Sequence, residues 1–415
     1  LARGFWRDRE RPVLINNWEA TYFDFDEDKI LEIVKTAKEL GVELFVLDDG
    51  WFGKRNDDTS SLGDWYPNLE KLPDGITGVA RRVEEMGLKF GLWFEPEMTN
   101  KESRLYREHP DWILSVPGRK VSVGRNQYVL DFSREEVVNA IFEQMKKVLT
   151  EAPISYIKWD MNRSMSEVYS AGAGAKDQGK VMHKYILGVY RLYDMLTKEF
   201  PEILFESCAS GGARFDPGLL YYAPQCWTSD DTDAVERCKI QYGTSFVYPV
   251  SSMGAHVSAV PNHQLLRNTS LETRANVAYF GTFGYELDPN RLTEEEKEEV
   301  KAQIAFMKQY RHLIQYGTFY RLLSPFEGNE TAWMVVSEDK TRAIVGYYKV
   351  LQSVNGPYKK VRLQGLDPDR KYHVTGMEPG KYEEDLYGDE LLWYGLNVSD
   401  ASSGENKEKY NGKNG

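Results

Sequence analysis

The chain has 415 residues, a length that fits one large domain of about 250 residues joined to a smaller one. Lysine and arginine number 52 against 64 aspartates and glutamates, so the net charge of −12 argues against nucleic acid or an anionic membrane as the primary partner. Apolar residues make up 41% of the chain and charged residues 28%, which excludes intrinsic disorder, and no run of about 18 apolar residues is present to span a membrane.

Cysteine usage and aromatic content say less about function. Cys208, Cys226 and Cys238 form no CxxC pair, which favours a reducing compartment. The chain begins without an initiator methionine or a signal-peptide pattern, and we expect its N-terminus to be a cut. The 10 tryptophans and 26 tyrosines suit a sugar-binding surface, since sugar C–H faces stack on aromatic rings, and they suit a large core equally well.

Short apolar runs alternate with amphipathic helical stretches from residue 13 to about residue 315. This alternation predicts parallel strands joined by crossover helices. The eight candidate strands are Val13–Asn17, Glu43–Leu47, Lys89–Phe94, Gln127–Asp131, Ser155–Asp160, Ile203–Ser207, Gln225–Ser229 and Phe246–Ser251. Eight strands close a (β/α)₈ barrel, and the sequence has neither a GxGxxG after the first strand nor a phosphate-binding loop motif. We therefore predict an α/β fold with a TIM barrel over residues 1–316.

The pattern changes after Gln315 to strands of period two. They are Ala332–Ser337, Arg342–Tyr348, Lys359–Leu363 and Lys371–Val374. We predict a small antiparallel β-sandwich domain over residues 317–398. Residues 399–415 are rich in serine, glycine, asparagine and lysine without periodicity, so we expect a disordered tail there.

Acidic residues and tryptophans recur where the candidate barrel strands end. A single aspartate after a strand is most often a turn residue or a helix cap. Six or seven at equivalent positions instead predict an acidic bowl at the C-terminal end of the barrel, where TIM-barrel chemistry takes place. The segments include Asn16-Asn17-Trp18-Glu19, Leu47-Asp48-Asp49-Gly50-Trp51, Trp93-Phe94-Glu95-Pro96-Glu97, Leu130-Asp131, Lys158-Trp159-Asp160-Met161-Asn162-Arg163, Glu206-Ser207-Cys208 and Trp227-Thr228-Ser229-Asp230-Asp231-Thr232-Asp233.

Two chemistries use such a bowl, a divalent metal site and a carboxylate pair that cleaves a glycosidic bond. Lys158 and Asp160 are two residues apart, so both face the barrel lumen. An ammonium group beside Asp160 favours an ionised, nucleophilic carboxylate, whereas it would compete with a metal ion. A structural salt bridge in the lumen is the alternative for this lysine.

A glycosidase also needs a second carboxyl group that keeps a proton for the leaving oxygen. Asp230, Asp231 and Asp233 follow the strand Gln225–Ser229, two strands further around the ring. Crowding of three acids makes loss of a proton harder, as a proton donor requires. Spacing alone does not choose among the three.

Other motifs predict little. The six histidines include no HxH or HExxH, so we expect no zinc site. Ser210-Gly211-Gly212 would present backbone N–H groups to a ligand, with a plain loop as the alternative.

In combination, the strand-end motifs resemble the bacterial α-galactosidases of glycoside hydrolase family 36, the melibiases. The resemblance runs from about residue 5 to residue 395. The blocks that carry it start at Leu47, Trp93, Lys158, Cys208 and Trp227, and the last of these contains Ser229-Asp230-Asp231-Thr232-Asp233.

This resemblance implies an enzyme that releases terminal α-linked galactose from melibiose- and raffinose-type substrates by retaining double displacement, with no cofactor or metal. It implies that Asp160 is the nucleophile and Asp230 the acid/base. By the same comparison, the sugar pocket contains Trp18, Asp48, Asp49, Trp93, Arg125, Lys158, Asn162, Cys208 and Gly211.

Members of this family usually carry an N-terminal β-sandwich domain that supports tetramer assembly and closes part of the substrate site. This chain starts just before the barrel, so we expect that domain to be missing. The resemblance also implies a homotetramer for the full-length protein and a cytoplasmic location. The alternatives are an α-N-acetylgalactosaminidase or galactosyl transferase with the same site, a galactose-binding fragment without turnover, and a metal-dependent barrel lyase or isomerase.

Overall fold

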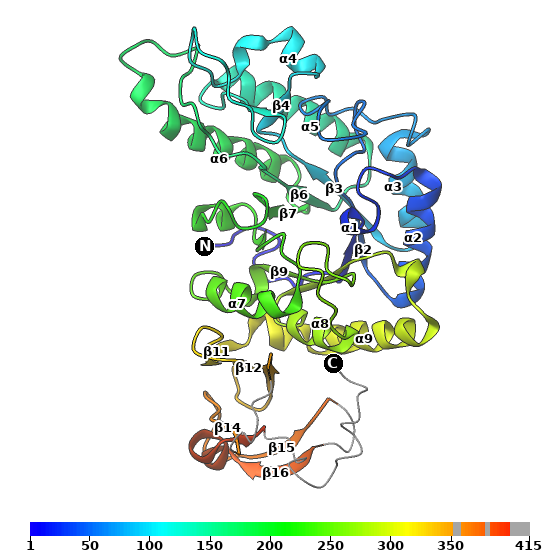
Figure 1. Ribbon diagram of the computed structural model, residues 1–415, viewed down its shortest axis with the longest axis vertical. Coiled ribbons are helices and arrows are strands. Elements are labelled where there is room, and N and C mark those ends of the chain that lie inside the picture. Colours follow the sequence, from blue (N-terminus) through cyan, green and yellow to red (C-terminus); the bar gives the residue numbers. More distant parts are fainter. Residues whose placement is uncertain (352–357, 378–381, 399–415) are drawn as a thin grey trace. The chain divides into compact units, whose positions relative to one another are not determined.

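The computed structural model describes residues 1–351, 358–377 and 382–398 (Figure 1). The chain forms two compact units, one of residues 1–234 and 244–311 and one of residues 235–243 and 312 onward. The tail over residues 399–415, for which we predict disorder, lies outside the described residues.

A closed barrel of eight parallel strands forms the centre of the first unit, which confirms the predicted fold class. The strand order around the barrel is β1-β10-β9-β8-β7-β6-β3-β2. The barrel strands are β1 (Leu14–Asn16), β2 (Leu44–Leu47), β3 (Lys89–Phe94), β6 (Tyr156–Trp159), β7 (Leu204–Ser207), β8 (Gln225–Trp227), β9 (Met253–Ser258) and β10 (Thr282–Glu286).

Helices surround these strands in Figure 1. In α2, Asp26 caps the first turn by accepting from the Lys29 N–H at 2.9 Å, and the helix ends at Gly41 in the left-handed region (φ 96°). The helices are α1 (Trp18–Thr21), α2 (Glu27–Leu40), α3 (Gly75–Glu85), α4 (Arg104–Glu108), α5 (Glu135–Glu151), α6 (Val181–Glu199), α7 (Ala234–Thr244), α8 (Leu271–Ala278) and α9 (Glu294–Tyr316).

Two of the eight predicted barrel strands were wrong. β5 (Gln127–Val129) lies outside the barrel and pairs antiparallel with β4 (Met98–Asn100), and the next barrel strand after β3 is β6, which follows the long helix α5. The predicted strand Phe246–Ser251 contains Pro249, which cannot donate to a ladder, and the barrel strand is β9 just after it. We missed β10, whose apolar run is interrupted by Gly284.

Asp160 follows β6, and Asp230, Asp231 and Asp233 follow β8. As predicted, one strand, β7, separates β6 from β8 in the barrel. The floor of the lumen is an apolar cluster of Trp6, Leu14, Leu44, Val46, Tyr156 and Leu204. Residues two positions further along a strand share its face, so Asp48 and Lys158 lie in the lumen above Val46 and Tyr156.

The second unit contains antiparallel sheets, as predicted. Its core consists of Ala332, Met334, Val336, Val361, Leu363, Leu366 and Leu391. The sheets are β11 (Thr318–Leu323) with β12 (Glu330–Val336) and β13 (Ala343–Lys349), β14 (Lys360–Val361) with β17 (Leu396–Asn397), and β15 (Lys371–Thr375) with β16 (Glu383–Tyr387).

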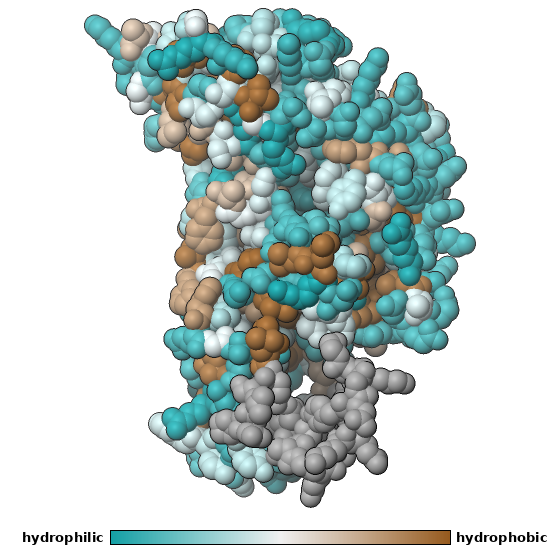
Figure 2. Space-filling model, in the orientation of Figure 1, coloured by the Kyte–Doolittle hydropathy of each residue, from teal (hydrophilic) through white to brown (hydrophobic). Residues whose placement is uncertain are grey.

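The described surface carries no sign of a membrane span. Figure 2 shows a mostly hydrophilic face with smaller hydrophobic patches, an ordinary mixture for a folded protein. Among the described residues, none of the helices combines the length and apolar character needed to cross a bilayer. Cys208, Cys226 and Cys238 are buried.

Candidate active site

A cavity of about 600 Å³ opens at the C-terminal ends of the barrel strands. Nine of the eleven predicted site residues line it: Trp18, Asp48, Asp49, Trp93, Arg125, Lys158, Asp160, Asn162 and Asp230. Five further residues complete its wall: Glu19, Trp227, His263, Gln264 and Glu286.

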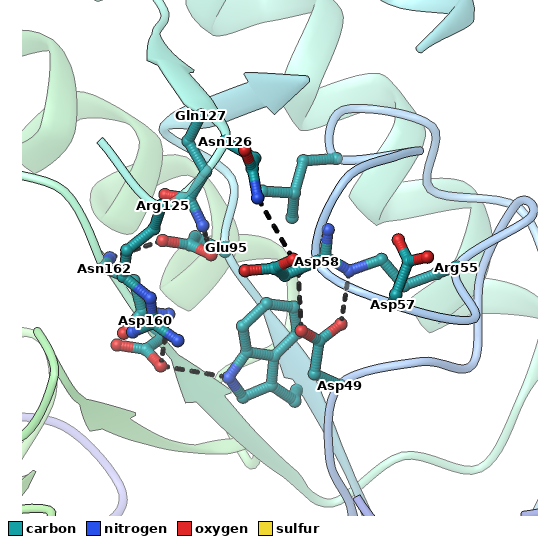
Figure 3. Close-up of polar contacts among 12 residues, drawn as sticks. Asp49, Arg55, Asp57, Asp58, Glu95, Arg125, Asn126, Gln127, Asp160 and Asn162 are labelled. Atoms are coloured by element: carbon teal, nitrogen blue, oxygen red, sulfur yellow. Dashed lines mark hydrogen bonds and ion pairs between the residues drawn. The ribbon is translucent and has the colours of Figure 1, made fainter. Parts of the chain in front are cut away.

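Asp160 follows β6 and is surrounded by N–H donors (Figure 3). Its Oδ2 accepts from Trp93 Nε1 at 3.2 Å and from Asn162 Nδ2 at 2.9 Å. Its Oδ1 accepts from the backbone N–H groups of Met161 at 2.8 Å and Ser210 at 3.2 Å. These four donors fix both oxygens of the Asp160 carboxyl group at the cavity wall.

Asp230 lies in the loop after β8, where a different environment acts on its carboxyl group. Burial raises its pKa, and the negative charge of Asp160 raises it further, while the Lys158 ammonium acts in the opposite direction. Trp227 Nε1 donates to Asp230 Oδ1 at 2.9 Å, and Gln264 Nε2 donates to its backbone carbonyl at 3.2 Å. Asp230 therefore keeps its proton to a higher pH than an exposed aspartate.

The two other acids of this segment have different surroundings. Asp231 Oδ1 accepts from the backbone N–H of Asp233 at 3.1 Å, which is a local turn contact. Asp233 forms an ion pair with Arg267. Of the three aspartates that spacing left open, Asp230 is the one that lines the cavity.

Lys158 lines the same cavity as Asp160 but donates to Asp48, which is the lumen salt bridge that the sequence left open as the alternative. Its Nζ lies 2.8 Å from Asp48 Oδ2, and Asn16 Nδ2 donates to the same oxygen at 2.7 Å. Burial disfavours the ammonium, but the charges of Asp48, Glu286 and Asp160 act together against burial, and the pKa of Lys158 is raised well above its ordinary value. The lysine acts on Asp160 and Asp230 through its charge alone.

Replacing Lys158 with methionine is expected to lower the free energy of unfolding by about 3–5 kcal/mol, because Asp48 would stay buried without its cation. The shift of the urea midpoint measures this loss. The double variant Lys158→Met with Asp48→Asn removes both charges and should recover part of the stability. Equal losses in the single and double variants would contradict a direct coupling of the two side chains.

Asp49 is held by a buried arginine (Figure 3). Arg55 Nε and Nη2 donate to its two carboxylate oxygens at 3.0 and 2.8 Å. Arg55 Nη1 also donates to the Ser60 carbonyl at 3.0 Å and to Asn100 Oδ1 at 3.2 Å. This two-point contact fixes the plane of the Asp49 carboxylate at the cavity wall.

Cys208 and Gly211 line a neighbouring cavity of about 440 Å³, which shares Trp227 with the first one. Gly211 has φ +79°, and a Cβ there would lie 2.5 Å from the Ser229 Cα, so the loop needs glycine for this close approach. Burial raises the pKa of the Cys208 thiol well above its usual range. Arg125 reaches over this loop and donates to Ser210 Oγ at 3.3 Å.

The five additional wall residues have no role predicted from the sequence. Glu19 and Trp227 stand in strand-end segments that it singled out. Glu286 ends β10, the strand that was missed, and His263 and Gln264 follow β9, which was misplaced. Correct placement of the last two strands would have brought these three residues to the same rim.

The acidic residues of the bowl have partners of their own. Glu97 accepts from Arg214 at 2.7 and 2.9 Å and from the Tyr185 hydroxyl at 2.6 Å. Glu286 Oε2 lies 3.2 Å from His256 Nδ1. Within the described part of the chain, no group of three or more histidine, cysteine, aspartate or glutamate side chains is arranged to hold a metal ion.

Curated proteins similar to this chain are α-galactosidases. Alpha-galactosidase AgaA of Geobacillus stearothermophilus is 60% identical over 403 residues, which are 97% of this chain and 54% of the relative. Alpha-galactosidase Mel36A of Lactobacillus acidophilus is 51% identical over 396 residues, 95% of this chain and 53% of the relative. The chain thus spans about half the length of these curated relatives.

Solved structures and family profiles agree with these relatives. The crystal structure of AgaA has a TM-score of 0.94 to this chain at 59% identity, covering 97% of this chain and 55% of the other. The Melibiase profile matches residues 1–317, and the profile of the glycosyl hydrolase family 36 C-terminal domain matches residues 330–411. The chain therefore belongs to the melibiase family, glycoside hydrolase family 36.

Proposed function

We propose that this chain is a retaining α-galactosidase that releases terminal non-reducing galactose from melibiose- and raffinose-type substrates. The observation that carries the proposal is the pair Asp160 and Asp230, two carboxyl groups in one cavity with opposite environments. N–H donors hold both carboxyl oxygens of Asp160, while burial and the neighbouring charge of Asp160 raise the pKa of Asp230. A nucleophile and an acid are thereby distinguished without a metal ion.

The relatives support this substrate class. AgaA and Mel36A are named α-galactosidases, and variants of AgaA have been solved in complex with raffinose and with stachyose. The alternatives with the same machinery, an α-N-acetylgalactosaminidase or a galactosyl transferase, differ in the space around the sugar C2 and in access of water to the acceptor side.

The proposed reaction has two displacements. Asp160 attacks C1 of the galactosyl group as the bond to the glycosidic oxygen breaks, and Asp230 gives its proton to that leaving oxygen. The product of this step is a β-galactosyl ester of Asp160. Asp230 then takes a proton from water, the water oxygen attacks C1, and the ester bond breaks to release α-galactose and the Asp160 carboxylate.

The remaining predicted residues are proposed to bind the sugar. Asp48 and Asp49 accept hydrogen bonds from galactose hydroxyls, since their charged partners fix both carboxylates. Lys158 and Asn162 donate hydrogen bonds to the sugar hydroxyls, and Trp93 and Trp18 flank the sugar ring. Arg125 forms one side of the cavity. Cys208 and Gly211 shape the loop that donates the Ser210 N–H to Asp160.

Hydrolysis of p-nitrophenyl α-D-galactoside by this chain, with and without EDTA, tests the proposal. We expect turnover that EDTA does not change and, by ¹H NMR, α-galactose as the first anomer released. Chelator-sensitive turnover would favour the metal-dependent barrel enzyme. A folded chain that binds galactose without turnover would be a galactose-binding fragment. If it cleaves p-nitrophenyl α-N-acetylgalactosaminide faster than the α-galactoside, the chain is an α-N-acetylgalactosaminidase.

We further propose that residues 1–316 are the catalytic barrel domain and residues 317–398 a C-terminal β domain. The full-length protein is proposed to be a cytoplasmic homotetramer. The family resemblance supports the tetramer, and the absence of a CxxC pair among Cys208, Cys226 and Cys238 favours a reducing compartment.

A further inference from the structure

Glu95 is a buried carboxyl group directly behind Asp160, and the proposed reaction does not use it. It follows β3 and has no solvent exposure. Its Oε1 accepts from the backbone N–H of Asn162, and its Oε2 accepts from Gln127 Nε2 at 3.0 Å (Figure 3). Glu95 thereby connects the β4–β5 hairpin to the turn that carries Asp160.

Asn162 transmits this contact to Asp160. Its Nδ2 donates to Asp160 Oδ2 at 2.9 Å, and its Oδ1 accepts from Ser210 Oγ at 2.8 Å. Movement of the Asn162 backbone would therefore move a donor of Asp160. Because a displacement of about 1 Å at a reacting group costs about 100-fold in rate, the position of this turn matters for catalysis.

Two negative charges at this place would repel each other. Burial, together with the negative charge of Asp160, raises the pKa of Glu95 to about 8. The N–H of Asn162 and the charge of Arg55, in the loop after β2, act in the opposite direction. Tyr185 on α6 also faces Glu95, and burial raises its pKa so far that it stays neutral. Glu95 is thus mainly protonated at neutral pH.

Gln127 accommodates a protonated Glu95. Its Oε1 is buried and lacks a hydrogen-bond partner. Because the two ends of a side-chain amide are interchangeable in shape, a half-turn of this group would place an acceptor opposite Glu95 Oε2, where it can take the carboxyl proton. The contact between the two side chains can therefore form in either protonation state.

We propose that Glu95 is a positioning residue for Asp160, which holds the turn through Asn162 without placing a second negative charge behind the nucleophile. The inference rests on the proposed role of Asp160. It deepens that role by naming the group that keeps the Asp160 donors in place.

Glu95→Gln tests the inference, since glutamine has the shape and hydrogen bonds of the neutral acid. With 2,4-dinitrophenyl α-D-galactoside, whose leaving group needs no proton from Asp230, the variant should keep kcat within about threefold of wild type at pH 6. Wild-type kcat should fall as the pH rises and Glu95 ionises, because the Asp160 carboxylate must then leave the ester next to a second negative charge, and the variant should lack this fall. Glu95→Ala should lose about 100-fold in kcat at every pH with little change in KM.

Glu97→Gln is the matched control, a buried acid of the same segment whose partner is Arg214, and it should leave the alkaline fall of kcat unchanged. Loss of activity in Glu95→Gln equal to that in Glu95→Ala, or a wild-type alkaline fall in Glu95→Gln, would overturn the inference.

A second measurement does not depend on turnover. The ¹³C resonance of the Glu95 carboxyl group, followed by NMR in the labelled 415-residue chain, should titrate near pH 8 and shift to lower pH in Asp160→Asn. If the wild-type chain is inactive, that result counts against the proposed function. The NMR titration does not need turnover, so it tests whether Glu95 is neutral in either case. A resonance that titrates near pH 4.5 overturns the inference.

Discussion

Asparagine in place of Asp160 is expected to lower kcat for p-nitrophenyl α-D-galactoside by roughly 10⁴- to 10⁶-fold. The amide cannot form the proposed ester with C1. It also reverses part of the hydrogen bonding, because an amide Nδ2 near Trp93 Nε1 or Asn162 Nδ2 would place donor against donor. Single-turnover and steady-state kinetics on the folded variant measure the loss.

Two companion variants distinguish a missing nucleophile from a damaged site. Asp160→Glu keeps the carboxylate but moves it by about 1 Å, and it should lose about 100-fold. In Asp160→Ala, added azide should attack C1 from the side that Asp160 occupied and give β-galactosyl azide from an activated substrate. An azide product of α configuration, or near-normal turnover in the asparagine variant, would show that a group other than Asp160 is the nucleophile.

The barrel could be predicted because most of its strands are short apolar runs that end in a charged residue. β2, β3 and β6 follow this pattern, and the register of a parallel barrel then brings Asp48, Trp93 and Asp160 to one rim. β10 does not follow it, because Gly281 and Gly284 interrupt the run, and a neighbouring backbone occupies the space that a side chain would need.

The partners of the charged groups could not be predicted from local spacing. Lys158 and Asp160 share a face of β6, yet the lysine extends to Asp48, which is 110 residues earlier in the chain. Of Asp230, Asp231 and Asp233, the last is paired with Arg267 from the loop after β9, and Asp230 is the one that lines the cavity. Both outcomes follow from contacts between distant segments, whereas spacing specifies only which side chains share a face.

The buried position of Glu95 shows a further limit. In the sequence, Glu95 and Glu97 are equivalent acids at the end of one strand. In the structure Glu97 receives the Arg214 guanidinium, whereas Glu95 has amide donors and the charge of Asp160 nearby. Glu97 is therefore paired with a cation, whereas Glu95 is kept neutral. Only the folded structure, and not the sequence, distinguishes the two acids.

Alanine in place of Asp230 is expected to lower kcat/KM for raffinose by about 10²- to 10⁴-fold, because the sugar leaving group needs a proton. 2,4-Dinitrophenyl α-D-galactoside does not need one, so its first step should slow far less. In the wild type, kcat/KM for raffinose should fall as pH rises through the pKa of Asp230, which burial and the charge of Asp160 raise. The variant should lack this dependence.

Asp231→Asn is the matched control, since Asp231 adjoins Asp230 but does not line the cavity. It should keep raffinose turnover within about threefold of wild type. Azide added to Asp230→Ala should attack the Asp160 ester from the open side and give α-galactosyl azide, the opposite configuration to that expected for Asp160→Ala. The two azide products together test whether the carboxyl groups lie on opposite faces of the sugar, because one carboxyl group serving both steps could not give both configurations. Equal losses for raffinose and the dinitrophenyl substrate in Asp230→Ala would instead mean that Asp230 positions the sugar and another group supplies the proton.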